Sequence, residues 1–399
     1  MSARMHIAWI TLVISVAACA PNTPYAYRPA SPSPTLTVSP APIQSPVATA
    51  SAAPSPENPT PALVPSLTCP GQYQQGHPLV IASPLVLGRY PSLAVLDVFD
   101  PLAPSSVCTV NISSFPEQPI QWLSGSEFLL IQNRPNRLID VDVARRSITP
   151  FRELNGSVFL ASLSPDRAWL ATMELNADGS KVARLYGPSG ERTLATFPQV
   201  PGPAGIEVYG LGGPKVEFSP DGALVLAVDW QASIADPRVP NLQLFNLQGS
   251  RISWDSKGVW AAWVRASLYY TTGDGKVHKW VDGAFPITVL ESAWLQPAVS
   301  PDGQNIAYLS TPGYRYNLEV METKSGKAKA LNTTGQRIHA LFVTPSLLWA
   351  GDVRVCDSCQ GGFQQTGKVY AYDLSTGVER EVRLPDLLYL GGASRSSGA

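Results

Sequence analysis

The chain has 399 residues, of which 44% are hydrophobic and only 15% are charged, and its formal net charge is −1. This composition is typical of a protein with a folded β-rich body, but its 38 prolines are unevenly distributed, which predicts an unstructured segment beside that body. A nearly neutral chain has no basic stripe to neutralise phosphates, so we expect no nucleic-acid partner.

The first segment, 1–18, is typical of a secretory signal. A charged start is followed by an apolar run over 7–16, which is shorter than the roughly 20 residues that a membrane span needs. The segment Val16-Ala17-Ala18-Cys19 resembles the lipobox of bacterial lipoproteins. This resemblance implies that Cys19 becomes the N-terminus and carries acyl chains such as palmitate. The protein would then be lipid-anchored at the extracytoplasmic face of the cell membrane, either outside the plasma membrane or in the periplasm; an ordinary secreted protein is the alternative.

Residues 19–66 consist almost entirely of Pro, Ser, Thr, Ala and Val. Such a segment cannot bury enough apolar surface to offset the entropy lost on ordering. Dense proline favours extended stretches of roughly 3 Å per residue, so the segment could reach on the order of 100 Å. We therefore expect a disordered tether that holds the folded body away from the membrane.

The stretch 297–331 has the pattern of a four-stranded antiparallel unit. An apolar segment leads into Ser300-Pro301-Asp302-Gly303, and three further strand-like segments follow. Proline sets the first corner of a β-turn and Asp-Gly tolerates its unusual backbone angles, so this motif predicts a tight hairpin turn. The motif recurs as Ser219-Pro220-Asp221-Gly222 and as Ser164-Pro165-Asp166-Arg167, where Arg167 replaces the glycine.

The order strand, Ser-Pro-Asp-Gly, strand, Asp-x-x-x-Gly, strand resembles the WD-repeat-like β-propeller repeat of the TolB type. The resemblance implies an all-β fold of four-stranded blades, each of about 40–45 residues. We expect about seven blades over 67–385, with six as the alternative, and a flexible tail over 386–399. The turn serine, or the residue expected at the equivalent position, marks each blade. These markers are Ser83, Ser124, Ser164, Ser219, Ser256, Ser300 and Thr344.

Four cysteines lie in the expected folded body. Outside the cytoplasm thiols oxidise, so we predict a disulfide between Cys69 and Cys108 that fastens the start of the propeller. Cys356 and Cys359 form a Cys-x-x-Cys motif with three interpretations, namely a local disulfide, a redox centre or a zinc site. The local disulfide is the one we expect in an exported protein.

In a four-stranded blade, the loops after strands two and four fall on one face of the propeller. The long inserts that interrupt the repeat all belong to that face, where loops on a rigid scaffold are suited to binding; the alternative is that they are merely tolerated insertions. The inserts are Pro198–Pro214, Trp230–Asn241, Thr311–Asn317 and Asp352–Thr366. The candidate binding residues in them are of types enriched at interface hot spots: Trp230, Arg238, Tyr314, Arg315 and Tyr316.

No sequence motif for a nucleophile elbow, a metal-binding helix or a phosphate loop occurs, so we expect no catalytic residue, metal or cofactor. The expected function is that of a monomeric, membrane-anchored binding or scaffolding module of the cell envelope. Its partner would be an envelope or extracellular protein, or a polysaccharide. The alternative is a propeller enzyme, a lyase or glycoside hydrolase, acting from the central channel with paired carboxylates that point inward.

Overall fold

The computed structural model describes the folded body with several gaps. The chain divides into two compact units, Met1–Pro59 and Thr60–Ala399, and the described residues all belong to the second. No helix in the described part is long and apolar enough to cross a membrane. The expected signal segment, Cys19 and nearly all of the expected tether lie outside the described residues. These are 64–83, 94–103, 105–112, 121–133, 136–154, 157–199, 214–229, 231–252, 258, 260–272, 275–292, 294–310, 316–355, 363–383 and 389–393.

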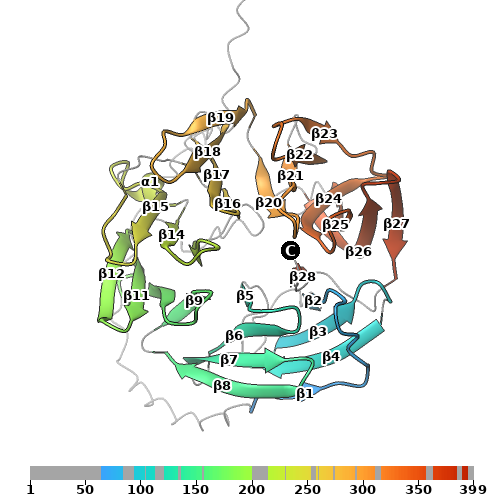
Figure 1. The fold of residues 1–399 in the computed structure, drawn as a ribbon, viewed down its shortest axis with the longest axis horizontal. Helices are drawn as coiled ribbons and strands as arrows, with labels where there is room; N and C mark the ends of the chain where they lie inside the picture. Colours follow the sequence, from blue (N-terminus) through green and yellow to red (C-terminus); the bar gives the residue numbers. More distant parts are fainter. Residues whose placement is uncertain are drawn as a thin grey trace, which may run out of the picture. The chain divides into compact units, whose positions relative to one another are not determined.

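The second unit is a β-propeller, as expected. Seven antiparallel sheets are arranged around a common centre, and we number them as blades 1 to 7 in chain order (Figure 1). Blade 1 contains β1 (Ser66–Thr68), β2 (Val80–Ser83), β3 (Ala94–Asp100), β4 (Ser105–Ile112) and β28 (Tyr389–Ala393). Blade 2 contains β5 (Gln121–Trp122), β6 (Glu127–Asn133), β7 (Asn136–Asp142) and β8 (Ser147–Glu153). Blade 3 contains β9 (Val158–Leu163), β10 (Leu170–Leu175), β11 (Lys181–Gly187) and β12 (Gly190–Phe197).

The remaining blades follow the same plan. Blade 4 has three described strands, β13 (Lys215–Phe218), β14 (Leu224–Val228) and β15 (Leu242–Asn246), with the short helix α1 (Ala232–Ala235) between the last two. Blade 5 contains β16 (Ala261–Val264), β17 (Ser267–Thr271), β18 (Val277–Val281) and β19 (Ile287–Leu290). Blade 6 contains β20 (Leu295–Val299), β21 (Asn305–Ser310), β22 (Asn317–Glu322) and β23 (Ala328–Ala330). Blade 7 contains β24 (Gln336–Phe342), β25 (Leu347–Val355), β26 (Phe363–Asp373) and β27 (Val378–Val382).

The hydrophobic core lies between the blades. Successive side chains of a strand point to opposite faces of the sheet, and both faces of each blade are covered by its neighbours. In β14, Val225 packs in the cluster shared with blade 3, whereas Leu226 packs in the cluster shared with blade 5. In β2, Val80 faces blade 7 and Ile81 faces blade 2. This burial on both faces explains why the strands have apolar runs instead of a strict alternation of apolar and polar residues.

The Ser-Pro-Asp-Gly turns have the structural role predicted from the sequence. The Ser300 hydroxyl donates to the Asp302 carboxylate at 2.6 Å, and that carboxylate accepts the Gln304 amide at 3.0 Å. Gly303 has a φ of 68°, in the left-handed region where glycine carries no Cβ penalty. Arg167 takes the same conformation in blade 3, with a φ of 61°. There a side chain accepts a conformation that is costly for residues other than glycine.

The innermost strand of blade 1 comes from the end of the chain. β28 pairs with β2 in antiparallel register, so the last described strand joins the first blade (Figure 1). The expectation of a flexible tail over 386–399 is therefore wrong for 389–393. It failed because the partner of this short, glycine-containing strand lies about 300 residues earlier in the chain, where no local pattern can reveal it.

The predicted number of seven blades is confirmed, but two of the seven markers do not occupy the equivalent turn. Since β28 is the first strand of blade 1, Ser83 ends the second strand of that blade, at the opposite end of the sheet. Ser256 precedes β16, whereas the first turn of blade 5 is formed at Arg265, which has a φ of 54°. Neither marker is followed by the Asp-Gly of the motif, so each rests on spacing alone. Ser124 and Thr344 also lack Asp-Gly but do lie in the equivalent turn, between β5 and β6 and between β24 and β25.

The predicted disulfide between Cys69 and Cys108 is present. Cys108 lies on β4, and Cys69 directly follows β1, which pairs with β4 as an additional outer strand of blade 1. The bond therefore fastens the first described residues to the propeller. Cys356 and Cys359 lie outside the described residues.

Side chains of innermost strands also bind the backbone of the next blade. In blade 2 the Gln121 amide donates to the Leu163 carbonyl and accepts from the Leu163 amide, both at 2.6 Å. In blade 6 the Gln296 side chain accepts the His339 amide of blade 7 at 2.9 Å. These contacts pair inward-facing backbone groups that the sheets leave free, and so they fix the spacing of neighbouring blades.

Candidate functional site

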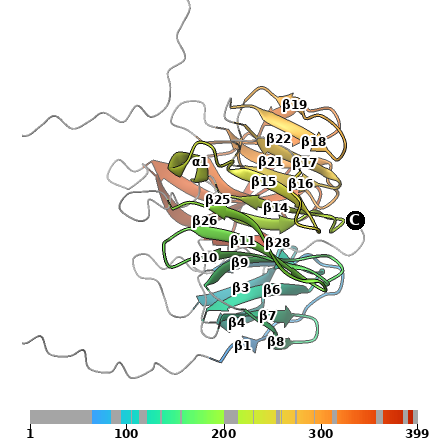
Figure 2. The ribbon, with the colours of Figure 1, turned by 90° about the vertical axis from the view of Figure 1, so that its left-hand side faces the viewer.

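The loops that follow the second and fourth strands of the blades form one face of the propeller, which we call the loop rim. Figure 2 views the propeller from the side and shows α1 and the ends of β25 and β26 on the same side. In the chain the expected inserts come after second or fourth strands, but 200–213, 230, 311–315 and 356–362 lie outside the described residues. The insert expected over Asp352–Thr366 is shorter than predicted, because β25 continues to Val355 and β26 begins at Phe363. Of the candidate binding residues, Arg238 and Tyr316 are described, and Trp230, Tyr314 and Arg315 are not.

The insert of blade 4 begins at a buried ion pair. Asp229, at the end of β14, is fully buried and its carboxylate lies 2.8 Å from the Lys181 ammonium of blade 3. The Asp229 backbone carbonyl also accepts the amide of Ala232 in α1. A buried carboxylate needs such a partner to offset its lost hydration. The ion pair thus anchors the start of this insert to the neighbouring blade.

Arg238 lies further along the same insert. Its side chain is 90% exposed and forms two hydrogen bonds with Asp236, at 2.9 and 2.7 Å. The hydrogen bond from Arg238 lowers the pKa of Asp236 to about 2, so the carboxylate stays charged. The guanidinium is thus paired but open to solvent, where a partner can reach it.

The insert of blade 7 is fixed by a buried arginine. The Arg337 side chain is 1% exposed and lies 2.5 Å from Asp352 and 2.8 Å from Glu379, and its guanidinium stacks 3.8 Å above the Tyr370 ring. Although burial opposes it, the hydrogen bonds from Arg337 and Thr334 lower the pKa of Glu379. Asp352 also accepts the Thr366 hydroxyl at 2.7 Å, which links β25 to β26 below the insert.

The insert of blade 6 ends at Tyr316, the second described candidate. The Tyr316 amide donates to the Gln336 side chain of blade 7 at 3.0 Å, and its ring packs against the core between blades 6 and 7. The structure does not bring Tyr316 together with Arg238, because they belong to blades 6 and 4. A partner that contacts both must therefore cover a large part of the rim.

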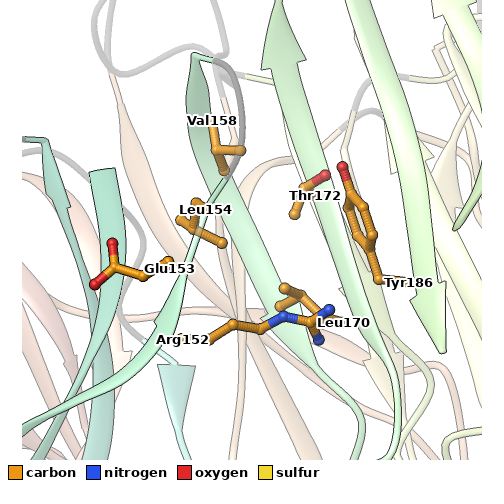
Figure 3. Close-up of a pocket in the computed structure, with 7 residues that line it drawn as sticks. All are labelled: Arg152, Glu153, Leu154, Val158, Leu170, Thr172 and Tyr186. Atoms are coloured by element: carbon orange, nitrogen blue, oxygen red, sulfur yellow. The ribbon is translucent and has the colours of Figure 1, made fainter. Parts of the chain in front are cut away.

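A pocket of about 50 Å³ lies between blades 2 and 3 (Figure 3). Its wall on blade 2 comes from the end of β8, and its wall on blade 3 comes from β9, β10 and β11. The pocket extends from the loop rim, where β8 ends and β9 begins, toward the opposite end of blade 3, where Leu170 begins β10 and pairs with Tyr186. The lining residues are Arg152, Glu153, Leu154, Val158, Leu170, Thr172 and Tyr186.

A buried carboxylate orients the polar lining of this pocket. Glu174 accepts the Thr172 hydroxyl at 3.0 Å, the Tyr186 hydroxyl at 2.7 Å and the Arg184 guanidinium at 3.1 Å. Burial and the Glu174 hydrogen bond raise the pKa of Tyr186, so its phenol stays protonated. The Arg152 guanidinium lies 5.6 Å from the centre of the Tyr186 ring.

Sequence reasoning missed this pocket. The one available signal is the run from Leu170 to Leu175, where Thr172 and Glu174 interrupt an otherwise apolar strand on the face toward blade 2. Nothing in the local sequence indicates that Arg152, on another blade, lies opposite them. Only the packing of two blades creates the pocket.

The alternative of a propeller enzyme requires two carboxylates that point into the central channel, where the innermost strands lie. Among the described innermost strands, Glu217 of β13 is the single acidic residue, and its carboxylate lies 2.6 Å from the Lys215 ammonium. The described residues also contain no group of three His, Cys, Asp or Glu side chains that could hold a metal ion.

Comparison with solved structures finds β-propellers of several kinds. TolB from Acinetobacter baumannii is 12% identical, with 79% of this chain and 82% of that chain covered and a TM-score of 0.40. The propeller domain of Cps50 (Swd1) from Myceliophteria thermophila is 12% identical, with 78% and 99% covered and a TM-score of 0.44. Oligogalacturonate lyase from Vibrio parahaemolyticus is 11% identical, with 77% and 86% covered and a TM-score of 0.45.

At these identities the similarity concerns the fold alone. No protein-family model and no curated protein sequence matches the chain.

Proposed function

We propose that the chain is a lipid-anchored binding protein whose propeller, built from TolB-type repeats, recognises an envelope or extracellular protein or a polysaccharide. In this proposal Cys19 carries the lipid in a bacterial lipoprotein, 19–66 form the tether and the loop rim is the binding face. The protein acts as a monomer at the extracytoplasmic side of the membrane and catalyses no reaction.

The observation that carries the proposal is the way in which the rim inserts are anchored. Insertion at a tight Ser-Pro-Asp-Gly turn would be equally easy for the chain, yet the long inserts follow second and fourth strands only. The insert of blade 4 begins at a buried charge, Asp229 with Lys181, and in blade 7 a buried pair of Arg337 and Asp352 joins β24 to β25 three residues before β25 ends at Val355. Such buried pairs fix geometry more than they add stability, which suits a surface that must be pre-organised for a partner.

Removing rim side chains tests the binding face. Arg238→Ala should weaken retention of the envelope component that the wild-type protein captures, while the melting temperature stays within about 2 °C. Tyr316→Ala should weaken retention too, and it should also lower the melting temperature, because its half-buried ring packs between blades 6 and 7. Arg145→Ala is the matched control, because Arg145 is 84% exposed in the β7–β8 turn on the opposite face. Loss of the captured component with Arg145→Ala, and not with the rim variants, would place the binding face on the other side.

Lipidation has a separate test. Cells given a fatty-acid probe should label the wild-type protein and not Cys19→Ala, and the variant should be released from the membrane fraction. The physical reason is that two or three acyl chains hold a protein firmly, whereas an unmodified chain with this short apolar run has no anchor. Equal release of both forms would contradict the lipid anchor.

A further inference from the structure

The pocket between blades 2 and 3 presents a hydrogen-bond acceptor on one wall. The hydroxyl protons of Thr172 and Tyr186 are both directed to the Glu174 carboxylate, which is itself only 8% exposed. A hydroxyl group has one donor and two acceptor lone pairs. With its donor committed to Glu174, the half-buried Tyr186 hydroxyl can only accept a hydrogen bond from a molecule in the pocket, whereas Thr172 is fully buried and out of reach (Figure 3).

The opposite side of the pocket supplies a donor. Arg152 is exposed at the mouth, beside the Tyr186 ring, and a guanidinium can only donate hydrogen bonds. Between these polar groups lie the apolar side chains of Leu154, Val158 and Leu170. A ligand group that fits this lining has one donor, one acceptor and an apolar end.

The size of the pocket limits which ligand groups can enter it. A volume of about 50 Å³ holds roughly three or four water-sized groups. An acetamido group has four heavy atoms, namely a nitrogen that donates, a carbonyl oxygen that accepts, the carbonyl carbon and an apolar methyl. A whole sugar ring is too large for the cavity and would lie outside it.

We propose that this pocket receives the acetamido group of an N-acetylated amino sugar, and that it is a subsite for polysaccharide on the loop rim. The methyl group packs against the half-buried Leu154, the N–H donates to the Tyr186 hydroxyl, and the carbonyl accepts from Arg152. The sugar ring lies at the mouth, where Glu153, with its side chain 70% exposed, is placed to accept its hydroxyls. This inference rests on the proposed binding function and selects polysaccharide as the ligand class.

The charged mouth favours a sugar over an acetylated lysine, which carries the same terminal group. A lysine side chain would place four methylene groups beside Arg152 and Glu153, whereas sugar hydroxyls can bond to both. The binding assay therefore uses the full chain in detergent with three probes. These are the trimer of N-acetylglucosamine, the corresponding trimer of glucosamine and an acetyl-lysine peptide, each titrated by calorimetry.

We expect the N-acetylated trimer to bind at least about tenfold more tightly than either other probe. The glucosamine trimer lacks the acetyl group, and the acetyl-lysine peptide lacks the sugar hydroxyls. Equal affinity for the glucosamine trimer would overturn the acetamido assignment. Tighter binding of the acetyl-lysine peptide would overturn the carbohydrate assignment, and no binding of any probe would overturn the subsite altogether.

Two variants assign the binding to this pocket. Tyr186→Phe and Arg152→Gln should each weaken binding of the N-acetylated trimer by about tenfold. The matched control for the first is Tyr308→Phe, because Tyr308 donates to Glu319 at 2.7 Å beside the Ser310 hydroxyl and is fully buried away from any ligand. The control for the second is Arg145→Gln on the opposite face.

If Tyr186→Phe and Tyr308→Phe change binding equally, the effect is structural and the pocket assignment fails. Failure of this inference remains distinct from failure of the proposed function. Arg238→Ala and Tyr316→Ala test capture by the rim in a separate assay, and neither residue lines the pocket.

Discussion

Buried charged side chains in this propeller are held by several partners each. Arg337 has two carboxylates and an aromatic ring around it, and Asp229 has the Lys181 ammonium and the Gln231 amide. Removing one partner of such a group leaves an uncompensated buried charge, which costs far more than the pair contributes. At the residue scale, polar pairing therefore decides which substitutions the chain tolerates.

The turn aspartate gives the simplest residue-scale prediction. Asp302→Ala should lower the free energy of unfolding by about 1 kcal/mol, because the Ser300 hydroxyl and the Gln304 amide lose their shared acceptor. Asp302→Asn keeps an acceptor oxygen and should cost less. Denaturant titration of the three proteins measures the difference. If the alanine variant is as stable as the wild type, the motif does not have the structural role assigned to it.

A second prediction concerns pH. Burial, followed by the neighbouring Glu127, raises the pKa of Asp140 from an ordinary 3.8 to about 6. Glu127 is itself paired with Arg167 of blade 3 at 2.7 Å. Because the folded-state pKa is the higher one, the stability that protonated Asp140 contributes is fully present below pH 3.8 and is lost as the pH rises through about 6.

Asp140→Asn keeps this position neutral at every pH. The wild type should lose stability between about pH 4 and pH 7 as Asp140 ionises, and the variant should not. The melting temperature of the variant relative to that of the wild type should therefore rise over this range. Thermal melts over this range measure the effect. A difference that stays constant across the range would contradict the raised pKa of Asp140.

At the scale of the elements, blades are joined by apolar clusters and by side chains that bind the backbone of the next innermost strand. Apolar contact is not directional, whereas the hydrogen bonds between Gln121 and Leu163 and between Gln296 and His339 are, so they add a directional constraint to the close-packed clusters. A single side chain thus helps to align two neighbouring blades.

Gln121→Leu should lower the free energy of unfolding by about 2 kcal/mol, since it leaves both the amide and the carbonyl of Leu163 without this partner. Gln296→Leu is the comparison at the contact of blades 6 and 7, where it removes the acceptor of the His339 amide. Denaturant unfolding of both variants provides the measurement. A Gln121→Leu protein as stable as the wild type would show that packing, and not backbone pairing, dominates this contact.

For the whole molecule, closure of the propeller depends on β28. This strand pairs with Val80, Ile81 and Ala82 of β2, all of which are fully buried. Deletion of 386–399 should expose these residues and lower stability by on the order of several kcal/mol. Deletion of 394–399, which begins after β28, is the control and should melt as the intact chain does. If both deletions behave alike, β28 does not close the propeller.

The sequence by itself determined the repeated unit, the number of blades and the Cys69–Cys108 disulfide. Tight turns and strand periodicity depend on residues close together in the chain, so Ser-Pro-Asp-Gly and a period of about 40–45 residues suffice to predict them. The disulfide needed one further argument, from the oxidising compartment that the N-terminal segment implies.

Three features were decided only by the tertiary structure. They are the pairing of β28 with β2, the side-chain hydrogen bonds between neighbouring innermost strands, and the pocket between blades 2 and 3. β28 and β2 are separated by about 300 residues, and Arg152 meets Tyr186 because two independently patterned blades pack face to face. Local sequence reports which residues are apolar and where the chain turns. It does not report which polar groups two packed blades leave opposite one another, and in this protein those groups make the candidate site.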